Sequence, residues 1–333
     1  MWSCIENDML RKKYTMAFIS TTAKHSDDFL RLPDKEILGD DTIHLLVTNE
    51  SIATKLFKYL NGKVPDIFID IERKQEIDLM KLAEESINDS RIHPYKPNDI
   101  TVEAADQLLL YHFQGNLTGK NVLLYGNGNI NAKLAIRLTE RNANVYLYGR
   151  NQKKSKDLAN AINLILPAYS PNVVRVFDDE ELFDAMVSFI SAEKVITSDF
   201  VAYLKSGGIA LDGGIGNYTE EFIFDAINKG INVLRLDVRI GLPFLEASTK
   251  AVKHSFFQEI MGQREISNIS IVAGGIIGAS GSVIVDRIDQ PKQIIGVANG
   301  IGGVKNESTL SDHDKRAIKI INEYIIQSKQ EDL

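Results

Sequence analysis

The first hundred residues alternate short apolar runs with amphipathic stretches. This pattern predicts strands at 16–20, 43–48 and 66–71, and helices at 51–60 and 76–87. Strands of about five residues that alternate with helices of ten or more are typical of βαβ units around a largely parallel sheet. We therefore expect an N-terminal α/β lobe.

A connector is predicted at 91–99, because two prolines in a polar cluster oppose regular structure there. Thr101 then begins a helix that bridges to the next domain.

A second and clearer alternation begins at Lys120. Six strands are predicted, at 121–126, 144–149, 172–177, 186–191, 208–214 and 232–238. Helices are predicted between most of them, at 130–141, 153–165, 198–205 and 219–228. This arrangement is what a doubly wound nucleotide-binding domain requires.

The rest of the chain has a different character. A helix at 244–261 is expected to cross back toward the first domain, and a last amphipathic helix is expected at 311–327. Between them, 266–304 holds eight of the 23 glycines among Ile and Val runs, which favours short hairpin strands. The predicted fold is a two-domain α/β protein, with a substrate lobe at 1–100, a dinucleotide-binding domain at 101–262 and a glycine-rich extension at 263–333. The extension either packs on the first lobe or forms a dimer contact.

The predicted strand at 121–126 leads through a glycine turn into a helix. The turn reads Gly126, Asn127, Gly128, Asn129, Ile130. Gly126 permits the sharp turn, Gly128 lets the backbone approach a pyrophosphate, and free N–H groups at the helix start bind the anion. This strand, turn and helix in succession predict a Rossmann dinucleotide site.

Asn131 occupies the position where the third glycine of such a turn usually lies, and Ala132 follows it. The larger side chain either holds the helix and strand slightly apart or places an amide near the phosphates.

The next strand ends in a basic loop, 149–154, that contains Arg150, Asn151, Lys153 and Lys154 and no acidic residue. An NAD-specific site usually has Asp or Glu here to bind the ribose 2′-hydroxyl, whereas Arg suits a 2′-phosphate. We expect NADP as the cofactor, with NADPH preferred over NADH; the alternative is a solvated basic loop.

From about Thr101 to Gly262 the chain resembles the shikimate dehydrogenase and methylene-tetrahydrofolate dehydrogenase type of Rossmann domain. The similar stretches are LTGKNVLLYGNGNINAKLAIRL, LYGRNQKKSKDLANAI, ALDGGIGNYTEEFIFDAINKG and GLPFLEASTKAVKHSFFQEIMG. The second is similar to the loop that binds NADPH in that family, and the last to its closing helix. The resemblance implies an N-terminal substrate lobe and a cleft between two lobes.

The chain departs from shikimate dehydrogenase proper at the catalytic positions. Val102 stands where that family has a catalytic Asp after a Thr, its N-terminal lysine motif is not recognisable, and the glutamine of its closing helix falls near Ser248. The run at 101–105, Thr-Val-Glu-Ala-Ala, is similar to a segment of dipicolinate synthase, an NADPH-linked enzyme.

The catalytic candidates lie at the start of the bridging helix. Thr101, Glu103 and Asp106 form either an acid/base site or a helix cap, in which Thr101 accepts an N–H and the helix dipole favours the acids. Glu103 and Asp106 share a helix face because they are three residues apart. His93 and Lys96 are alternative acid/base groups.

Further ligand contacts are expected at the carboxyl ends of the strands, where ligands bind in this fold. Ser191 and Ala192 end the fourth strand and would meet the nicotinamide ribose, while Gly213 and Gly214 end the fifth and would face the ring. Arg239 is expected either to bind a substrate carboxylate or to form an interdomain ion pair, and Ser248, at the place of the closing-helix glutamine, is the second expected substrate residue.

Composition narrows the remaining possibilities. A net charge of −7 argues against wholesale nucleic-acid binding, and no apolar run approaches the length of a membrane span. The single cysteine, Cys4, excludes an internal disulfide and a cysteine-based zinc site, and no cluster with metal-ligand spacing is present. The start of the chain does not read as a secretory signal, so we expect a cytoplasmic protein.

These features predict an oxidoreductase that transfers a hydride between NADP(H) and a small carbonyl, alcohol or imine, and a homodimer. A lyase or cyclase with bound dinucleotide and a non-catalytic redox sensor remain the alternatives.

Overall fold

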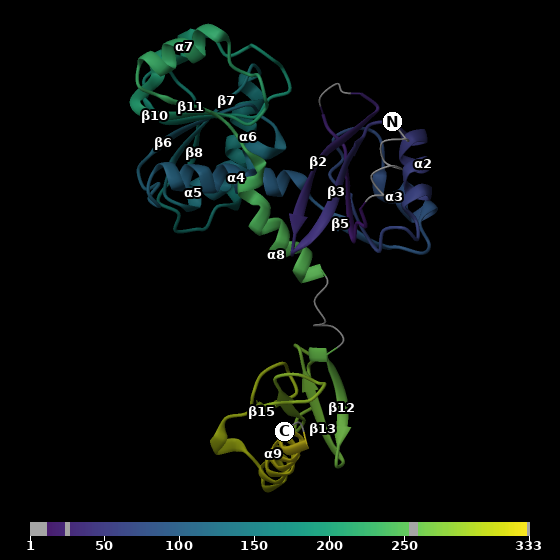
Figure 1. Cartoon of the computed structure of the whole chain (residues 1–333). Helices are drawn as coiled ribbons and strands as arrows, with labels where there is room; N and C mark the ends of the chain where they lie inside the picture. The colour runs from purple at the N-terminus through teal and green to yellow at the C-terminus, as the bar shows by residue number, and fades with distance from the viewer. Residues whose placement is uncertain (1–11, 24–26, 253–258, 332–333) are drawn as a thin grey trace. The chain divides into compact units, whose positions relative to one another are not determined.

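The computed structural model describes residues 12–23, 27–252 and 259–331, so Cys4 and the N-terminal stretch lie outside the described residues. The chain forms two compact units, Met1–Ser248 and Thr249–Leu333 (Figure 1). The first unit contains two lobes, each built on its own sheet.

The N-terminal lobe is a five-stranded sheet in the order β2-β3-β1-β4-β5. The strands are β1 (Met16–Ser20), β2 (Phe29–Ile37), β3 (Asp40–Val47), β4 (Asp66–Asp70) and β5 (Arg91–Tyr95). All neighbouring pairs are parallel except β2 with β3. One face packs on α2 (Glu50–Leu60) and α3 (Leu79–Ser86), and the largely parallel lobe that the sequence predicts is confirmed.

Two strands and a helix start differ from the prediction. The connector expected at 91–99 is wrong: β5 lies there, and α4 (Pro97–His112) begins before Thr101. Pro94 is tolerated because β5 is an edge strand that pairs only with β4, and Pro97 occupies the first helical turn, where no intrahelical N–H bond is lost. The unpredicted β2 is also an edge strand, and its register shifts around Pro33.

The second lobe is a parallel six-stranded sheet in the order β11-β10-β9-β6-β7-β8. Its strands are β6 (Asn121–Tyr125), β7 (Asn144–Tyr148), β8 (Val174–Val176), β9 (Phe183–Ser188), β10 (Leu204–Asp212) and β11 (Asn232–Arg235). Counted along the chain, this is the Rossmann order, so the doubly wound prediction is confirmed. The point where the order reverses lies between β6 and β9.

Helices cover both faces of this sheet. One face packs on α4, α5 (Asn129–Glu140) and α6 (Gln152–Ile165). The other face packs on α7 (Glu220–Asn228) and the segment Ser198–Tyr203, which is a 3₁₀ helix where the sequence predicts an ordinary one.

Two helices join the lobes of the first unit, and Figure 1 shows α4 and α8 between the two sheets. Ile100 of α4 packs on the N-terminal sheet, while Val102 and Leu109 pack in the Rossmann core. The helix expected at 244–261 begins earlier: α8 runs Leu242–Val252, and 253–258 lie outside the described residues. Leu245 packs against the N-terminal sheet, so the predicted return to the first lobe is confirmed.

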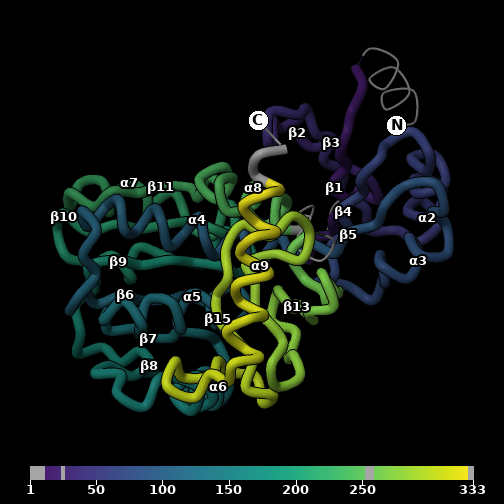
Figure 2. Tube along the Cα trace, turned by 90° about the horizontal axis from the view of Figure 1, so that it is seen from below, coloured from purple at the N-terminus to yellow at the C-terminus, as the bar shows by residue number. Residues whose placement is uncertain are grey.

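The second unit is a four-stranded sheet covered by one long helix. Its strands are β12 (Gly262–Ile266), β13 (Ile269–Ala273), β14 (Val283–Val285) and β15 (Ile294–Val297), in chain order. Figure 2 shows α9 (Asp312–Glu331) running along these strands, with Ala317, Ile321 and Ile325 in their shared core. The glycine-rich segment therefore forms short strands, as predicted, although β13 and β14 pair in parallel. The domain boundaries at residues 100 and 262 stay a proposal.

Candidate functional site

The turn after β6 depends on a glycine at its first position. Gly126 has φ +121° and its N–H donates to the carbonyl of Tyr148 at 2.7 Å. A Cβ there would lie 2.8 Å from the carbonyl oxygen of Phe189 and 2.8 Å from the side chain of Ile190. Only glycine fits this conformation without moving the backbone.

The second glycine leaves open space. Gly128 is the N-cap of α5, no side chain caps this helix start, and a Cβ added at Gly128 would meet nothing within 4 Å. The first N–H groups of α5 thus have no side-chain acceptor, which is what an anion at a helix start requires. The turn fits the pyrophosphate of a dinucleotide.

Asn131 braces this turn from inside. Its side chain is fully buried and its amide donates to the carbonyls of Tyr125 and Gly126, both at 2.9 Å. The structure thus places the amide against the end of β6, and the alternative of an amide among the phosphates does not apply.

A cavity of about 440 Å³ extends from the turn to the loop after β7. Eight of the predicted cofactor residues line it: Gly126, Asn127, Gly128, Arg150, Asn151, Lys154, Ser191 and Ala192. Asn151 caps α6 by accepting from the N–H of Lys154 at 3.0 Å. Arg150, Lys153 and Lys154 are exposed, and no ion pair joins them to an acid among the described residues. Their charge is available to an anion.

A larger cavity of about 770 Å³ adjoins the first and reaches the N-terminal lobe. It includes the other predicted cofactor residues, Asn129, Ile130, Gly213 and Gly214, and also Thr101. Its N-terminal walls follow three strand ends: Thr21 to Ala23 after β1, Ile71 to Lys74 after β4, and Lys96 to Asn98 after β5. Gly128, Phe189, Ile190 and Ser191 line both cavities.

Lys74 is the most enclosed cation of the larger cavity. Its Nζ lies 2.6 Å from Oδ2 of Asp70, whose side chain is fully buried, and the lysine side chain itself is 13% exposed. Asp70 also accepts the N–H groups of Thr21 and Glu72, at 3.2 and 2.8 Å. Burial raises the pKa of Asp70, and the adjacent ammonium acts in the opposite direction. The pair fixes one amine at the cavity wall.

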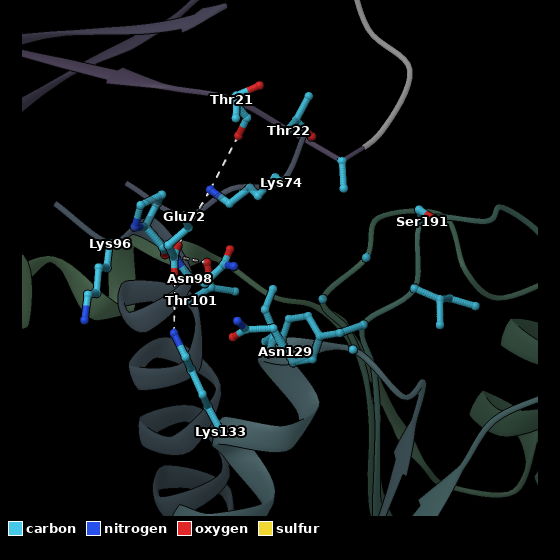
Figure 3. Close-up of a pocket in the computed structure, with 18 of the residues that line it drawn as sticks. Thr21, Thr22, Glu72, Lys74, Lys96, Asn98, Thr101, Asn129, Lys133 and Ser191 are labelled. Carbon is cyan, nitrogen blue, oxygen red and sulfur yellow. Dashed lines mark hydrogen bonds and ion pairs between the residues drawn. The ribbon is translucent and has the colours of Figure 1, made fainter. Parts of the chain in front are cut away.

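Glu72 connects this amine to the Rossmann lobe. Figure 3 shows Glu72 between Lys74 on one side and Lys133 of α5 on the other. The Glu72 carboxylate lies 3.0 Å from Nζ of Lys133 and 3.7 Å from Nζ of Lys74. Lys133 also binds Asp99 at 2.6 Å. Burial lowers the pKa of Lys133, but its hydrogen bonds with Asp99 and Glu72 outweigh burial and raise it overall.

The loop after β10 is held by a single carboxylate. Asp212 accepts four backbone N–H groups, from residues 214–217, at 2.6 to 3.1 Å. The Asn217 amide then donates to the carbonyls of Ile190 and Ala192 at 3.0 and 2.8 Å. The loops after β9 and β10, which are expected at the nicotinamide end, are therefore hydrogen-bonded to each other.

Phe189 lies at the join of the two cavities. A Cβ on Gly213 would be 2.0 Å from the Phe189 ring, so the absence of a side chain at Gly213 makes room for this ring. Sequence patterns alone did not single out Phe189.

The predicted catalytic acids lie elsewhere. Glu103 pairs with Arg137, and the fully buried Asp106 receives two hydrogen bonds from Arg141 at 2.8 Å. Neither acid lines either cavity. Both carboxylates join α4 to α5 and its C-terminal cap, so their position does not support proton transfer to a ligand in the cavities. Thr101 lies within α4 and donates its hydroxyl to the carbonyl of Pro97, so it is not the predicted cap.

The other candidates are also dispersed. His93 binds Asp66 at 2.8 Å outside the cavities. Lys96 lines the larger cavity, but Figure 3 shows its side chain directed away from Lys74. Arg239 pairs with the nearby Asp237, and Ser248 donates to the carbonyl of Leu245 within α8. Neither of these last two lines either of the two cavities described above.

Sequence reasoning did not identify Asp70, Glu72, Lys74 and Lys133. The available signal was the polar run ERK just after the buried strand β4, because polar groups at the carboxyl end of a parallel strand face the ligand edge of the sheet.

Neither a membrane span nor a metal cluster is found in the described part of the chain. None of its helices is long and apolar enough to cross a bilayer. Across the same residues, no three His, Cys, Asp or Glu side chains are grouped so that they would hold a metal ion.

Comparisons with known proteins give partial likenesses. No family model matches the chain. It is 27% identical over 128 residues to the bifunctional protein FolD of Lactobacillus delbrueckii subsp. bulgaricus, which covers 36% of this chain and 45% of that protein. The chain thus spans less than half the length of this curated relative.

Several solved structures are similar at low identity. A shikimate dehydrogenase in complex with NADP+ is 14% identical, with 71% of this chain and 90% of that chain covered and a TM-score of 0.46. The shikimate dehydrogenase of Aquifex aeolicus is 17% identical, with 72% and 92% covered and a TM-score of 0.43. The dipicolinate synthase of Bacillus subtilis is 15% identical, with 71% and 77% covered and a TM-score of 0.36. These proteins are of the types that the sequence resembles.

Proposed function

We propose that this protein is an NADP-dependent oxidoreductase that interconverts a small carbonyl or imine with the corresponding alcohol or amine. The observation that carries the proposal is the pair of adjoining cavities, which share Gly128, Phe189, Ile190 and Ser191. One cavity begins at a turn that fits a dinucleotide pyrophosphate, and the other ends at the enclosed amine of Lys74. A dinucleotide that follows the shared wall would have its reactive end facing Lys74.

The chemistry divides between cofactor and protein. A bound nicotinamide supplies or accepts the hydride at the substrate carbon. Lys74 supplies the proton: its ammonium donates to the carbonyl oxygen or imine nitrogen during reduction, and its amine accepts that proton in the reverse direction. Asp70 holds the amine in place at 2.6 Å.

The rest of the larger cavity suits a small polar substrate. Hydroxyl and amide groups of Thr21, Thr22, Asn98 and Asn129 line it, together with apolar Ile71 and Phe189. The polar groups would orient the substrate, and the apolar ones would exclude water from the reacting carbon.

The basic loop after β7 supports a preference for NADPH. Arg150 and Lys154 line the smaller cavity without an acidic partner among the described residues, which suits a 2′-phosphate. The homodimer and the cytoplasmic location stay proposals; light scattering of the full chain would test the first.

The proposal is tested first by calorimetric titration of the full chain with NADPH and NADH. A panel of small oxo acids, sugars and cyclic imines is then screened for a substrate-dependent fall in NADPH absorbance. We expect binding and turnover with at least one class. A redox sensor would bind the cofactor and turn over nothing, and a lyase or cyclase would convert substrate with no net change in NADPH.

A further inference from the structure

One carboxylate in the larger cavity is shared by lysines from the two lobes. Glu72, in the loop after β4, places Oε1 3.0 Å from Lys133 and Oε2 3.7 Å from Lys74. Its side chain is only 9% exposed, so solvent screens these interactions weakly. A change in the charge of either lysine therefore alters the electrostatic interaction of Glu72 with the other.

The remaining partners of this cluster are also fixed. Asp70 and the carbonyl of Thr21 face the Lys74 ammonium, at 2.6 and 3.5 Å. The N–H of Asn98 donates to Glu72 Oε2 at 2.6 Å, and the Tyr95 hydroxyl lies within the electrostatic influence of Asp70 and Glu72. On the other side, Asp99 binds Lys133 at 2.6 Å.

Lys133 connects this cluster to the phosphate turn through a rigid element. It lies one helical turn after Asn129, the first residue of α5, and the start of that helix is where a pyrophosphate fits. Arg137 follows one turn later and makes a comparable ion pair with Glu103, but it does not line the cavity.

We propose that Lys133 is a positioning residue for Lys74 and acts by sharing the Glu72 carboxylate, which links the helix at the phosphate turn to the reactive amine. The inference rests on the proposed function only in calling Lys74 the reactive amine. Lys133 and Lys74 compete for the negative charge of Glu72. While Lys133 is bound to Glu72, the carboxylate stabilises the Lys74 ammonium less than it otherwise would.

Competition predicts opposite effects for two substitutions. Lys133→Met keeps the aliphatic stem but removes the charge, so Glu72 is left to Lys74 and the ammonium form of Lys74 is favoured. Glu72→Gln removes the shared charge, so the unprotonated amine is favoured. A purely structural role would loosen the loop in both variants and make Lys74 more accessible in each.

The test is trace labelling of the full chain with acetic anhydride at fixed pH, followed by mass spectrometry of the peptide that contains Lys74. Only the unprotonated amine reacts. We expect the labelling rate to fall about three- to tenfold in Lys133→Met and to rise about three- to tenfold in Glu72→Gln, as for a change of half to one logarithmic unit in proton affinity. Arg137→Met should leave the rate unchanged, and Lys133→Arg should restore the wild-type rate.

The inference is overturned if Lys133→Met matches Arg137→Met, or if Lys133→Met and Glu72→Gln both raise the rate. If Lys133→Met folds poorly, Lys133→Gln takes its place, because it also removes the charge and is expected to lower the rate. Labelling needs neither cofactor nor substrate. A protein that binds no NADPH would therefore remove the proposed function and leave this result standing.

Discussion

The two adjoining cavities of the first unit are built in different ways. The smaller one is called the nucleotide side below, and the larger one the substrate side. The nucleotide side comes mainly from one stretch, β6 to the start of α6, which the loop after β9 completes, and its key features are the positive φ of Gly126 and the open space at Gly128. The other side is assembled from the ends of three strands, and ion pairs among Asp70, Glu72 and Lys74 hold it together. The first side is defined by steric limits on the chain, and the second by charge.

This difference has consequences for substitution. Steric requirements at a turn admit one residue type, so a change there either breaks the fold or blocks the ligand. A charge network keeps its shape when a side chain is replaced by one of similar volume, but its proton chemistry changes. The two sides should therefore respond to substitution in different ways.

Replacing Lys74 should have the largest effect on the substrate side. Lys74→Ala should lower turnover by about 10²- to 10⁴-fold, the usual contribution of a general acid or base, and leave NADPH affinity nearly unchanged. Steady-state kinetics and calorimetry measure the two quantities. Lys96→Ala is the matched control, because it lies on the same cavity with its side chain directed away from Lys74. Equal losses in the two variants would contradict the assignment of Lys74.

On the nucleotide side, substitution of the two glycines should have different effects. Gly128→Val should fold normally, since a Cβ there meets nothing within 4 Å, yet lower NADPH affinity at least about a hundredfold because the side chain fills the pyrophosphate space. Gly126→Ala should instead destabilise the protein without ligand by about 1 to 3 kcal/mol, because φ is +121° and the Cβ meets the Phe189 carbonyl at 2.8 Å. Calorimetry and thermal unfolding separate the two effects. A folded Gly128→Val variant with wild-type affinity would remove the phosphate-turn assignment.

The basic loop introduces charge into the nucleotide side. Arg150→Ala should weaken NADPH binding by about 1.5 to 3 kcal/mol, on the order of ten- to a hundredfold, and leave NADH binding unchanged, because only NADPH carries the 2′-phosphate. Lys154→Ala, measured beside it, reports the share of the neighbouring lysine. Wild-type protein that binds NADH as tightly as NADPH would defeat this assignment.

The smallest expected effect is the pH dependence of the stability of the N-terminal lobe, which carries the strand ends of the substrate side. His44 is 4% exposed, stacked on Phe18 with ring centroids 4.8 Å apart, and burial lowers its pKa to about 3 from 6.5. The folded lobe keeps His44 neutral, whereas the unfolded chain binds a proton below pH 6.5, so stability falls as pH falls through this window. Between pH 6.5 and 5.5 the loss should be about 1 kcal/mol, because the unfolded histidine is only half protonated at pH 6.5.

His44→Phe should abolish this component of the pH dependence. Hydrogen exchange of the β1 and β3 amides, measured between pH 6.5 and 5.5, reports the stability of this lobe in both proteins. The same slope in both would show that His44 is not its source. The exposed His313, replaced by Gln, serves as a control.

Much of this molecule follows from local sequence. The strands at β1, β4, β6 and β7 and the helices between them are set by apolar periodicity, because each strand is buried and each helix buries one face. The phosphate turn is predictable for a related reason: its glycines, its strand and its helix are contiguous, and the backbone itself makes the site. All twelve predicted cofactor residues line the two cavities.

Edge strands and charge networks do not follow from local sequence. Nothing in RIHPY predicts a strand, because Pro94 is permitted only by the edge position that the sheet order gives it.

Glu103 and Asp106 have the residue types of a catalytic pair, but tertiary packing places Arg137 and Arg141 beside them. Lys74 looks like an ordinary loop lysine until the fold buries the neighbouring Asp70 and Glu72 and α5 places Lys133 beside Glu72. The sequence by itself determined the nucleotide turn, since backbone sterics act between neighbours. Only the tertiary structure decided the charged side, because Coulomb interactions act between whichever groups the fold brings within a few ångströms.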